Sequence, residues 1–278
     1  MNFKSHSFGK IEFQMENKYI GICLKGEANL KRNDNPIGEI RYNSFGTPMK
    51  IVDYRRQGDL DVQFLDVHGF IKYHASYTNF KKGQIRNPYD RTAHGIGFNG
   101  EGPYKTGGTA FDTKAFSIWY AIINRCYYEK NREKYPAYEK CFICEEWMNY
   151  QKFREWFDAN FYQVGTERMH IDKDILYKNN KFYSPDTCLM VPQRINMLFF
   201  SKPNTTGLPV GVQATGKRYS STYNGKQIGT FNTIEEAAIA HDKAKKEAIN
   251  RVANEYKKVI PDKVYQALIN WIPDYIEY

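Results

Sequence analysis

The chain has 278 residues, of which 41% are apolar and 26% charged, so it can bury real cores in one large domain or in two to three small ones. A formal net charge of +9 and a pI near 9.1 favour a polyanionic partner, with nucleic acid first. No apolar run approaches the roughly 20 residues of a membrane span, and residues 1–10 lack a signal-peptide core. We therefore expect a cytoplasmic protein without membrane contact, with its five cysteines reduced.

The first third, residues 1–105, is predicted to be a small antiparallel β module. Short β-rich runs alternate with turn residues such as the Asn-Asp-Asn-Pro of residues 33–36. Strands this closely spaced indicate a small barrel or a meander. The expected strands are residues 18–24, 39–42, 49–54, 60–65 and 71–77.

Two amphipathic helices are predicted next, over residues 115–127 and 145–161. Each repeats apolar residues at helical spacing, including Trp119 in the first helix and Trp147 and Trp156 in the second. These stripes are expected to form core by packing on each other and on the segment that follows. Near the end of the first helix, a rim of basic residues is expected to contact phosphates; it consists of Arg125, Lys130, Arg132 and Lys134.

Four cysteines surround the second helix in the sequence. Cys141 and Cys144 form one Cys-x-x-Cys pair, which Cys126 and Cys188 could complete as a structural Zn²⁺ site. The alternative is that all four are small buried apolar residues, as cysteine often is.

Residues 167–200 carry the polar groups that the rest of the chain surrounds. A strand is predicted over 169–176, a turn over 178–181, an extended run over 182–184, and a helix, or a strand and a helix, over 189–200. Along them come His170, Asp172, Asp174 and Asn196. A hard cation such as Mg²⁺ takes oxygen ligands from one or two side chains and leaves room for water and phosphate. This order of groups is what a hairpin-plus-helix metal nuclease needs.

The string IDKDI…NKFYSPDTCLMVP…N resembles the phage HNH-type, homing-like endonucleases, and SIWYAIINRCYYEKN…YPAYEKCFICEEWMNYQKFREWF resembles the segment that precedes their core. This resemblance implies a nuclease core over residues 106–202. It also implies hydrolysis of phosphodiester bonds in double-stranded DNA, with Mg²⁺ or Mn²⁺ as cofactor.

Two registers against the HNH pattern stay open. In the first register, His170 is the general base, a role that suits a neutral imidazole, and Asp172 is a metal ligand. In the second, Asp172 still binds the metal but Lys173 stands where the histidine should be. In either register the resemblance makes Asn196 the helix-borne ligand, with Asp174 as a further or alternate ligand. Arg168 or Lys173 would offset charge on the phosphate.

Residues 203–278 are predicted to be a sheet-plus-helix module. After a Gly- and Pro-containing linker come strands over 210–214, 218–223 and 226–231, with Asn-Gly at the tight turn. Thr233 and Glu236 form a capping box that opens a helix, and a last helix is expected over 259–278.

Gly211-Val212, Gly229-Thr230-Phe231 and Thr233-x-Glu235-Glu236-Ala237-Ala238 make this module resemble the ethylene-response-factor (APETALA-type) DNA-binding domain. The resemblance implies that the sheet enters the major groove. Gln213 replaces a usual Arg and Tyr219 a usual Trp, so the plant specificity is not expected. The implied DNA contacts are Gln213, Thr215, Lys217, Arg218, Ser220, Thr222, Lys226 and Gln227.

Together these features predict an α+β protein with three parts. The leading interpretation is a metal-dependent endonuclease that nicks or cleaves double-stranded DNA. The alternatives are a DNA-binding regulator on the same scaffold that does not cut, and a phage effector that binds a host protein.

Overall fold

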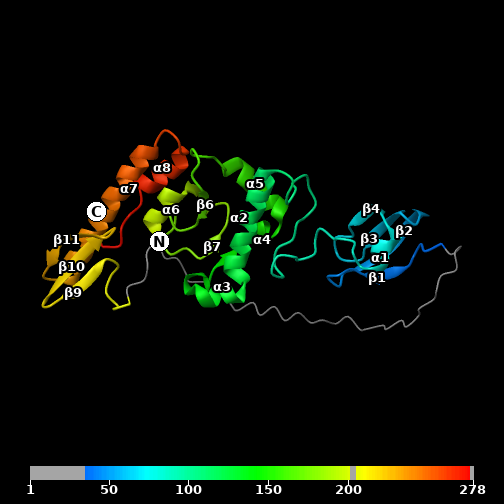
Figure 1. Cartoon of the computed structure of the whole chain (residues 1–278), viewed down its shortest axis with the longest axis horizontal. Helices are drawn as coiled ribbons and strands as arrows, with labels where there is room; N and C mark the ends of the chain where they lie inside the picture. The colour runs from blue at the N-terminus through cyan, green and yellow to red at the C-terminus, as the bar shows by residue number, and fades with distance from the viewer. Residues whose placement is uncertain (1–34, 201–204, 276–278) are drawn as a thin grey trace, which may run out of the picture.

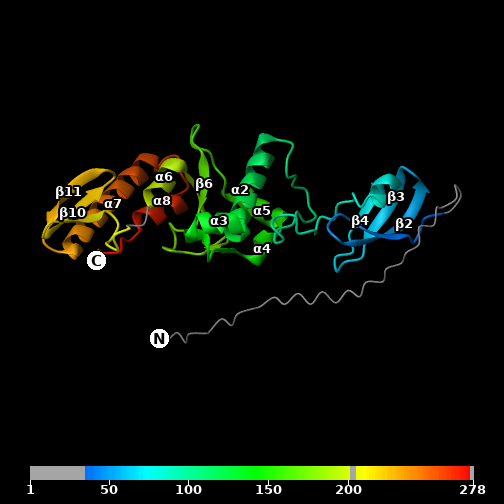
Figure 2. The ribbon, with the colours of Figure 1, turned by 60° about the horizontal axis from the view of Figure 1, so that its bottom comes forward.

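The computed structural model describes residues 35–200 and 205–275, and it has the predicted α+β class (Figure 1). The strand expected over residues 18–24 lies outside the described residues. The N-terminal sheet and the C-terminal sheet lie at opposite ends of the molecule, with the central helices between them (Figures 1 and 2). Among the described helices, none is long and apolar enough to cross a membrane.

The N-terminal module is a four-stranded antiparallel meander, as one of the two predicted arrangements had it. Its strands follow each other in the order β1-β2-β3-β4. The short helix α1 (Tyr77–Lys81) places Phe80 in the core between them. The strands are β1 (Ile40–Tyr42), β2 (Pro48–Arg56), β3 (Asp59–Phe64) and β4 (Ile71–Ala75).

This module ends near residue 92 rather than at residue 105. The Asn43 amide donates to Asp90 Oδ2 at 2.7 Å, and this buried bond fastens the chain after α1 to the meander. Beyond residue 92 the chain belongs to the central core instead. The backbone of Phe98 pairs with residues 148–150, and Gly97 lies so close to Trp119 that a side chain would not fit.

The central helices differ from the prediction at one break. Helix α2 (Ala110–Tyr127) begins at a capping box formed by Thr109 and Asp112. The helix predicted over residues 145–161 is two helices, α4 (Glu145–Met148) and α5 (Tyr150–Asn160). Asn149 separates them because its side chain accepts from the N–H of Gln151 and so caps α5.

The segment between these helices adds small elements around one aromatic core. Residues of α2, α4 and α5 bury Trp119, Trp147, Tyr150, Phe153 and Phe157 completely, so the apolar stripes are core, as predicted. Strand β5 pairs in parallel with β7 and closes this core. The small elements are α3 (Glu129–Lys134), the 3₁₀ helix η1 (Pro136–Tyr138), β5 (Phe142–Ile143) and β7 (Phe182–Tyr183).

A strand pair followed by a helix forms the next unit. Strand β6 (Met169–Asp172) ends four residues earlier than predicted, and it pairs antiparallel with β8 (Leu189–Pro192). Helix α6 (Gln193–Phe199) follows β8 directly. This is the strand-and-helix alternative of the prediction for residues 189–200.

The C-terminal part has the predicted three antiparallel strands and long helix. The strands β9 (Val212–Thr215), β10 (Arg218–Tyr223) and β11 (Lys226–Phe231) form a sheet in the order β11-β10-β9. Helix α7 (Ile234–Tyr256) starts at the predicted capping box. The last helix, α8 (Asp262–Ile269), is shorter than expected because residues 270–275 no longer follow a helical path.

Helix α7 joins two cores. Its first turns place Ala237 and Ala238 under the sheet, next to Val212. Its last turns place Ile249, Val252 and Tyr256 in a core shared with β8, α6 and α8. The C-terminal module is therefore packed against the strand-and-helix unit rather than attached to it by the linker alone.

Candidate functional site

One cavity brings together the residues that the sequence singled out between positions 170 and 196. It has a volume of about 140 Å³ and lies where β6, the turn after β6, α2 and α6 meet. All five of the predicted catalytic and metal-binding residues line it. The lining residues are Arg125, Tyr138, His170, Ile171, Asp172, Lys173, Asp174, Tyr183, Asn196, Phe199 and Phe200.

Asp172 ends strand β6 and shapes the turn after it. Its Oδ1 accepts the backbone N–H groups of Asp174 and Ile175, both at 2.8 Å, which turns the chain out of the strand. Burial raises the pKa of this carboxyl, although the two N–H bonds oppose the shift. Within the described residues, both of these hydrogen bonds go to Oδ1 and none goes to Oδ2.

Lys173 is buried, and its ammonium donates to three oxygen atoms of two residues. Its Nζ donates to both carboxylate oxygens of Asp174 at 2.8 Å and to the carbonyl of Asn180 at 2.5 Å. The Asn180 amide donates back to the carbonyl of Lys173 at 2.9 Å. These bonds stiffen the loop after β6, so Lys173 and Asp174 neutralise each other inside the cavity wall.

His170 comes from the same strand as Asp172, two residues earlier, so both side chains lie on one face of β6. Its Nε2 is buried and takes no hydrogen bond within the described chain. Burial lowers the pKa of this imidazole, and the nearby charge of Arg168 lowers it further. The lowered pKa favours the neutral imidazole, and His170 is among the residues that line the cavity.

The cavity also contains residues that the sequence indicated only in part. Asn196 enters from α6, as predicted, and Arg125 enters from the end of α2. Tyr183 was not anticipated, because its place depends on the parallel pairing of β7 with β5. Burial raises its pKa well above the ordinary value, so the phenol remains protonated.

The oxygen donors of this cavity suit a small hard cation. Asp172 Oδ2 and the Asn196 amide oxygen are hard ligands, and Mg²⁺ takes only one or two such protein groups. The carboxylate of Asp174 is held by Lys173, so it is the weaker candidate of the predicted set. Within residues 35–200 and 205–275, neither His170, Asp172 and Asp174 nor any three of the cysteines place three donor atoms within 4.8 Å of one another.

The four cysteines do not fit a zinc site in this arrangement. Cys126, Cys141 and Cys188 are buried in the aromatic core, and Cys144 packs at its edge. Within residues 35–200 and 205–275, no three of their sulfur atoms lie within 4.8 Å of one another, as a zinc ligand set would require. Their packing matches the alternative given from the sequence, that of small apolar residues.

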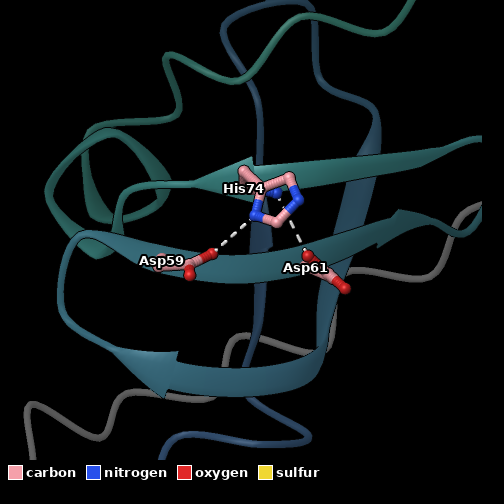
Figure 3. Close-up of side chains that lie close together, drawn as sticks. All are labelled: Asp59, Asp61 and His74. Carbon is pink, nitrogen blue, oxygen red and sulfur yellow. Dashed lines mark hydrogen bonds and ion pairs between the residues drawn. The ribbon is translucent and has the colours of Figure 1, made fainter.

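A second acidic cluster lies on the surface of the N-terminal module. His74 donates from its backbone to Asp61 and contacts Asp59 through Nδ1 at 2.9 Å (Figure 3). The guanidinium of Arg55 also binds both carboxylates, at 2.7 and 2.6 Å. Because Arg55 already supplies the positive charge, this cluster is a salt-bridge network.

The outer face of the C-terminal sheet carries most of the predicted DNA contacts. Cross-strand pairing places Thr215 beside Arg218, and Gln213 beside Ser220, on the face away from α7. Lys217, Lys226 and Gln227 are exposed around this face. Ser220 and Thr222 are less available, since their hydroxyls bond to the carbonyls of Gln213 and Gly211.

Arg168 is exposed beside the cavity but does not line it. No protein-family model matches the chain, and neither the curated proteins nor the solved structures contain a match.

Proposed function

We propose that this chain is a metal-dependent DNA endonuclease of the HNH type, acting in the cytoplasm of a host cell. The observation that carries the proposal is the single cavity shared by His170, Asp172 and Asn196. These three residues come from a strand and a helix, and Asp172 and Asn196 lie 24 residues apart in sequence, yet the fold brings them together. The exposed polar face of the C-terminal sheet supports DNA as the substrate.

In the proposed reaction, Asp172 and Asn196 would hold a Mg²⁺ or Mn²⁺ ion, which would supply positive charge next to the phosphate. The unpartnered Nε2 of His170 takes the proton from the attacking water. A new P–O bond forms from this water as the bond to the leaving sugar oxygen breaks. Arg125, which also lines the cavity, offsets charge on the phosphate.

Two features of the cavity favour a second function, that of a DNA-binding regulator that does not cut. Lys173 holds Asp174 in an ion pair, and the Asp172 carboxylate is committed in part to its turn. Both features lower the negative charge that a cation would meet. A protein of this kind would keep the sheet and bind DNA without hydrolysis.

The test is nicking of a supercoiled plasmid in Mg²⁺ or Mn²⁺ by the parent chain and by Asp172→Asn, His170→Ala and Asp186→Asn. Asp186 is an exposed acid of the same loop that does not line the cavity, so its variant is the matched control. We expect His170→Ala to lose roughly 10²–10⁴-fold in rate, Asp172→Asn to lose all activity, and Asp186→Asn to cut like the parent.

The other outcomes separate the alternatives. Cutting by His170→Ala with loss in Asp172→Asn would favour the register in which Lys173 occupies the histidine position. Parental cutting by Asp172→Asn would overturn the site. Tight DNA binding without cutting in any metal would establish the regulator.

A further inference from the structure

A second hollow, which the proposed reaction does not use, runs along α2 beside the candidate site. Its volume is about 390 Å³, within the range of small-ligand sites. Arg125 lines both this hollow and the cavity of His170 and Asp172, so the two are neighbours across one guanidinium. This hollow, which we call the α2 groove, is lined by Phe116, Ser117, Tyr120, Ala121, Asn124, Arg125 and Asn131.

The groove has an aromatic floor at one end. Phe116, Tyr120 and Asn124 are four residues apart on α2, so they form one row along the helix. The rings of Phe116 and Tyr120 have centroids 6.1 Å apart, and Tyr120 is 36% exposed. An exposed ring in a groove offers a stacking surface to a planar group.

The other end of the groove is an amide edge. Asn131 Nδ2 donates to Asn124 Oδ1, and this bond fixes both half-buried carboxamides. The Nδ2 of Asn124 and the Oδ1 of Asn131 then supply one donor and one acceptor next to the ring. A nucleobase presents the same combination, a π face and an edge of donors and acceptors.

We propose that the α2 groove is a subsite for one unpaired nucleobase of the DNA strand, next to the phosphate held in the cavity. Its position beside the reacting phosphate rests on the proposed function. Arg125 lies between the two hollows, where the sugar-phosphate link between base and reacting phosphate would pass. The base stacks on Tyr120, and its edge meets Asn124 and Asn131.

The test compares two single-stranded 12-mers of equal charge, one of thymidylates and one in which every base is replaced by an abasic site. Binding is measured in EDTA, so that no strand is cut. One stacked base contributes about 5- to 100-fold in affinity. We therefore expect the parent chain to bind the base-bearing strand at least about 5-fold more tightly than the abasic strand.

Tyr120→Ala and Tyr120→Leu should lose about 5-fold or more of this preference, while Tyr128→Ala should keep it. Tyr128 is a matched control because it is also 36% exposed and also contacts His94, with centroids 5.0 Å apart against 5.3 Å for Tyr120. The leucine variant retains apolar packing without a π face, and equal unfolding midpoints would show that both variants fold.

Equal preferences in the Tyr120 and Tyr128 variants, or no base preference in the parent, would overturn the subsite. The result is readable apart from the nuclease proposal, because binding is measured in EDTA, where neither a metal ion nor cutting takes part. Loss of preference in the Tyr120 variants without any plasmid nicking would leave a base-binding groove and remove the endonuclease.

Discussion

Lys173 occupies the position where one register against the HNH pattern expects a histidine, and its ammonium is already engaged. It donates to Asp174 and to the carbonyl of Asn180 from a site that is 7% exposed. A buried charge without partners destabilises the folded state. Without the ammonium of Lys173, the loop after β6 would lose the hydrogen bonds that hold it in place. The residue therefore acts on the geometry of the cavity wall.

We expect Lys173→Met to lower the free energy of unfolding by about 1–3 kcal/mol, since it removes hydrogen bonds that involve a charged donor. Urea denaturation followed by tryptophan fluorescence measures this change. Lys140→Met replaces an exposed lysine and should change stability by less than about 0.5 kcal/mol. Equal stability of the two variants would mean that Lys173 has no anchoring role.

The residues of the cavity could be selected from the sequence because their order along the chain was informative. The alternation of β6 puts His170 and Asp172 on one face, and this follows from spacing alone. The sequence did not reveal that Asp172 both accepts the N–H groups of its turn and lines the cavity, or that Lys173 donates to the carbonyl of Asn180. Both depend on where the loop turns, and several turns are compatible with its Asn- and Lys-rich composition.

At the scale of elements, Asp242 fastens the C-terminal segment to α7. Its Oδ2 accepts the backbone N–H groups of Asp274 and Tyr275 at 2.9 Å, and its Oδ1 lies 3.2 Å from His241 Nδ1. Burial opposes ionisation of this carboxyl, but these hydrogen bonds outweigh it and lower the pKa below the ordinary 3.8.

Because the folded-state pKa of Asp242 is depressed, its carboxylate adds stability above about pH 3.8 and loses it as the pH falls through the lower value. We expect Asp242→Asn to cost about 2 kcal/mol between pH 5 and 7, and the difference from the parent to shrink below pH 3.8. Urea unfolding across this pH range checks it, with Asp186→Asn as control. A difference that stays constant with pH would refute the charge-based anchor.

At the break between α4 and α5, the Asn149 side chain caps α5. Asn149→Ala removes the cap on the N–H of Gln151, and we expect a loss of about 0.5–2 kcal/mol in the free energy of unfolding. Asn160→Ala, at the other end of α5, removes one bond to the carbonyl of Trp156 and should cost less. A thermal melt of both variants decides between them, and a reversed order would contradict the capping role.

Elements whose signals are local were predicted well, and those set by distant segments were not. The capping box at Thr233 and the Asn-Gly turn between β10 and β11 each need only a few adjacent residues. The helix break at Asn149 depends on the backbone of Phe98, about fifty residues earlier. The pairing of β6 with β8 depends on which strand the core reaches, and periodicity within one strand does not reveal this.

At the scale of the molecule, the chain has separate cores, and we expect separate unfolding. The meander core around Phe80 shares no residue with the core around Tyr256. Tyr256→Ala should lower the free energy of unfolding of the central and C-terminal parts by about 3–5 kcal/mol and leave that of the meander unchanged. Phe80→Ala should do the reverse. Hydrogen exchange resolved along the chain measures both, and a joint loss of protection in either variant would refute the separation.

Helix α7 has 23 residues packed at both ends, and at about 1.5 Å per residue it is roughly 35 Å long. One turn of B-DNA measures about the same, 34–36 Å. Under the proposed function, the two ends of this helix, at the sheet and at the core around Tyr256, would stand about one helical turn of the duplex apart. One residue added to the middle of α7 would turn the sheet by about 100° relative to the core around Tyr256. Under the proposed function, this would change the position of the cut relative to the bound sequence.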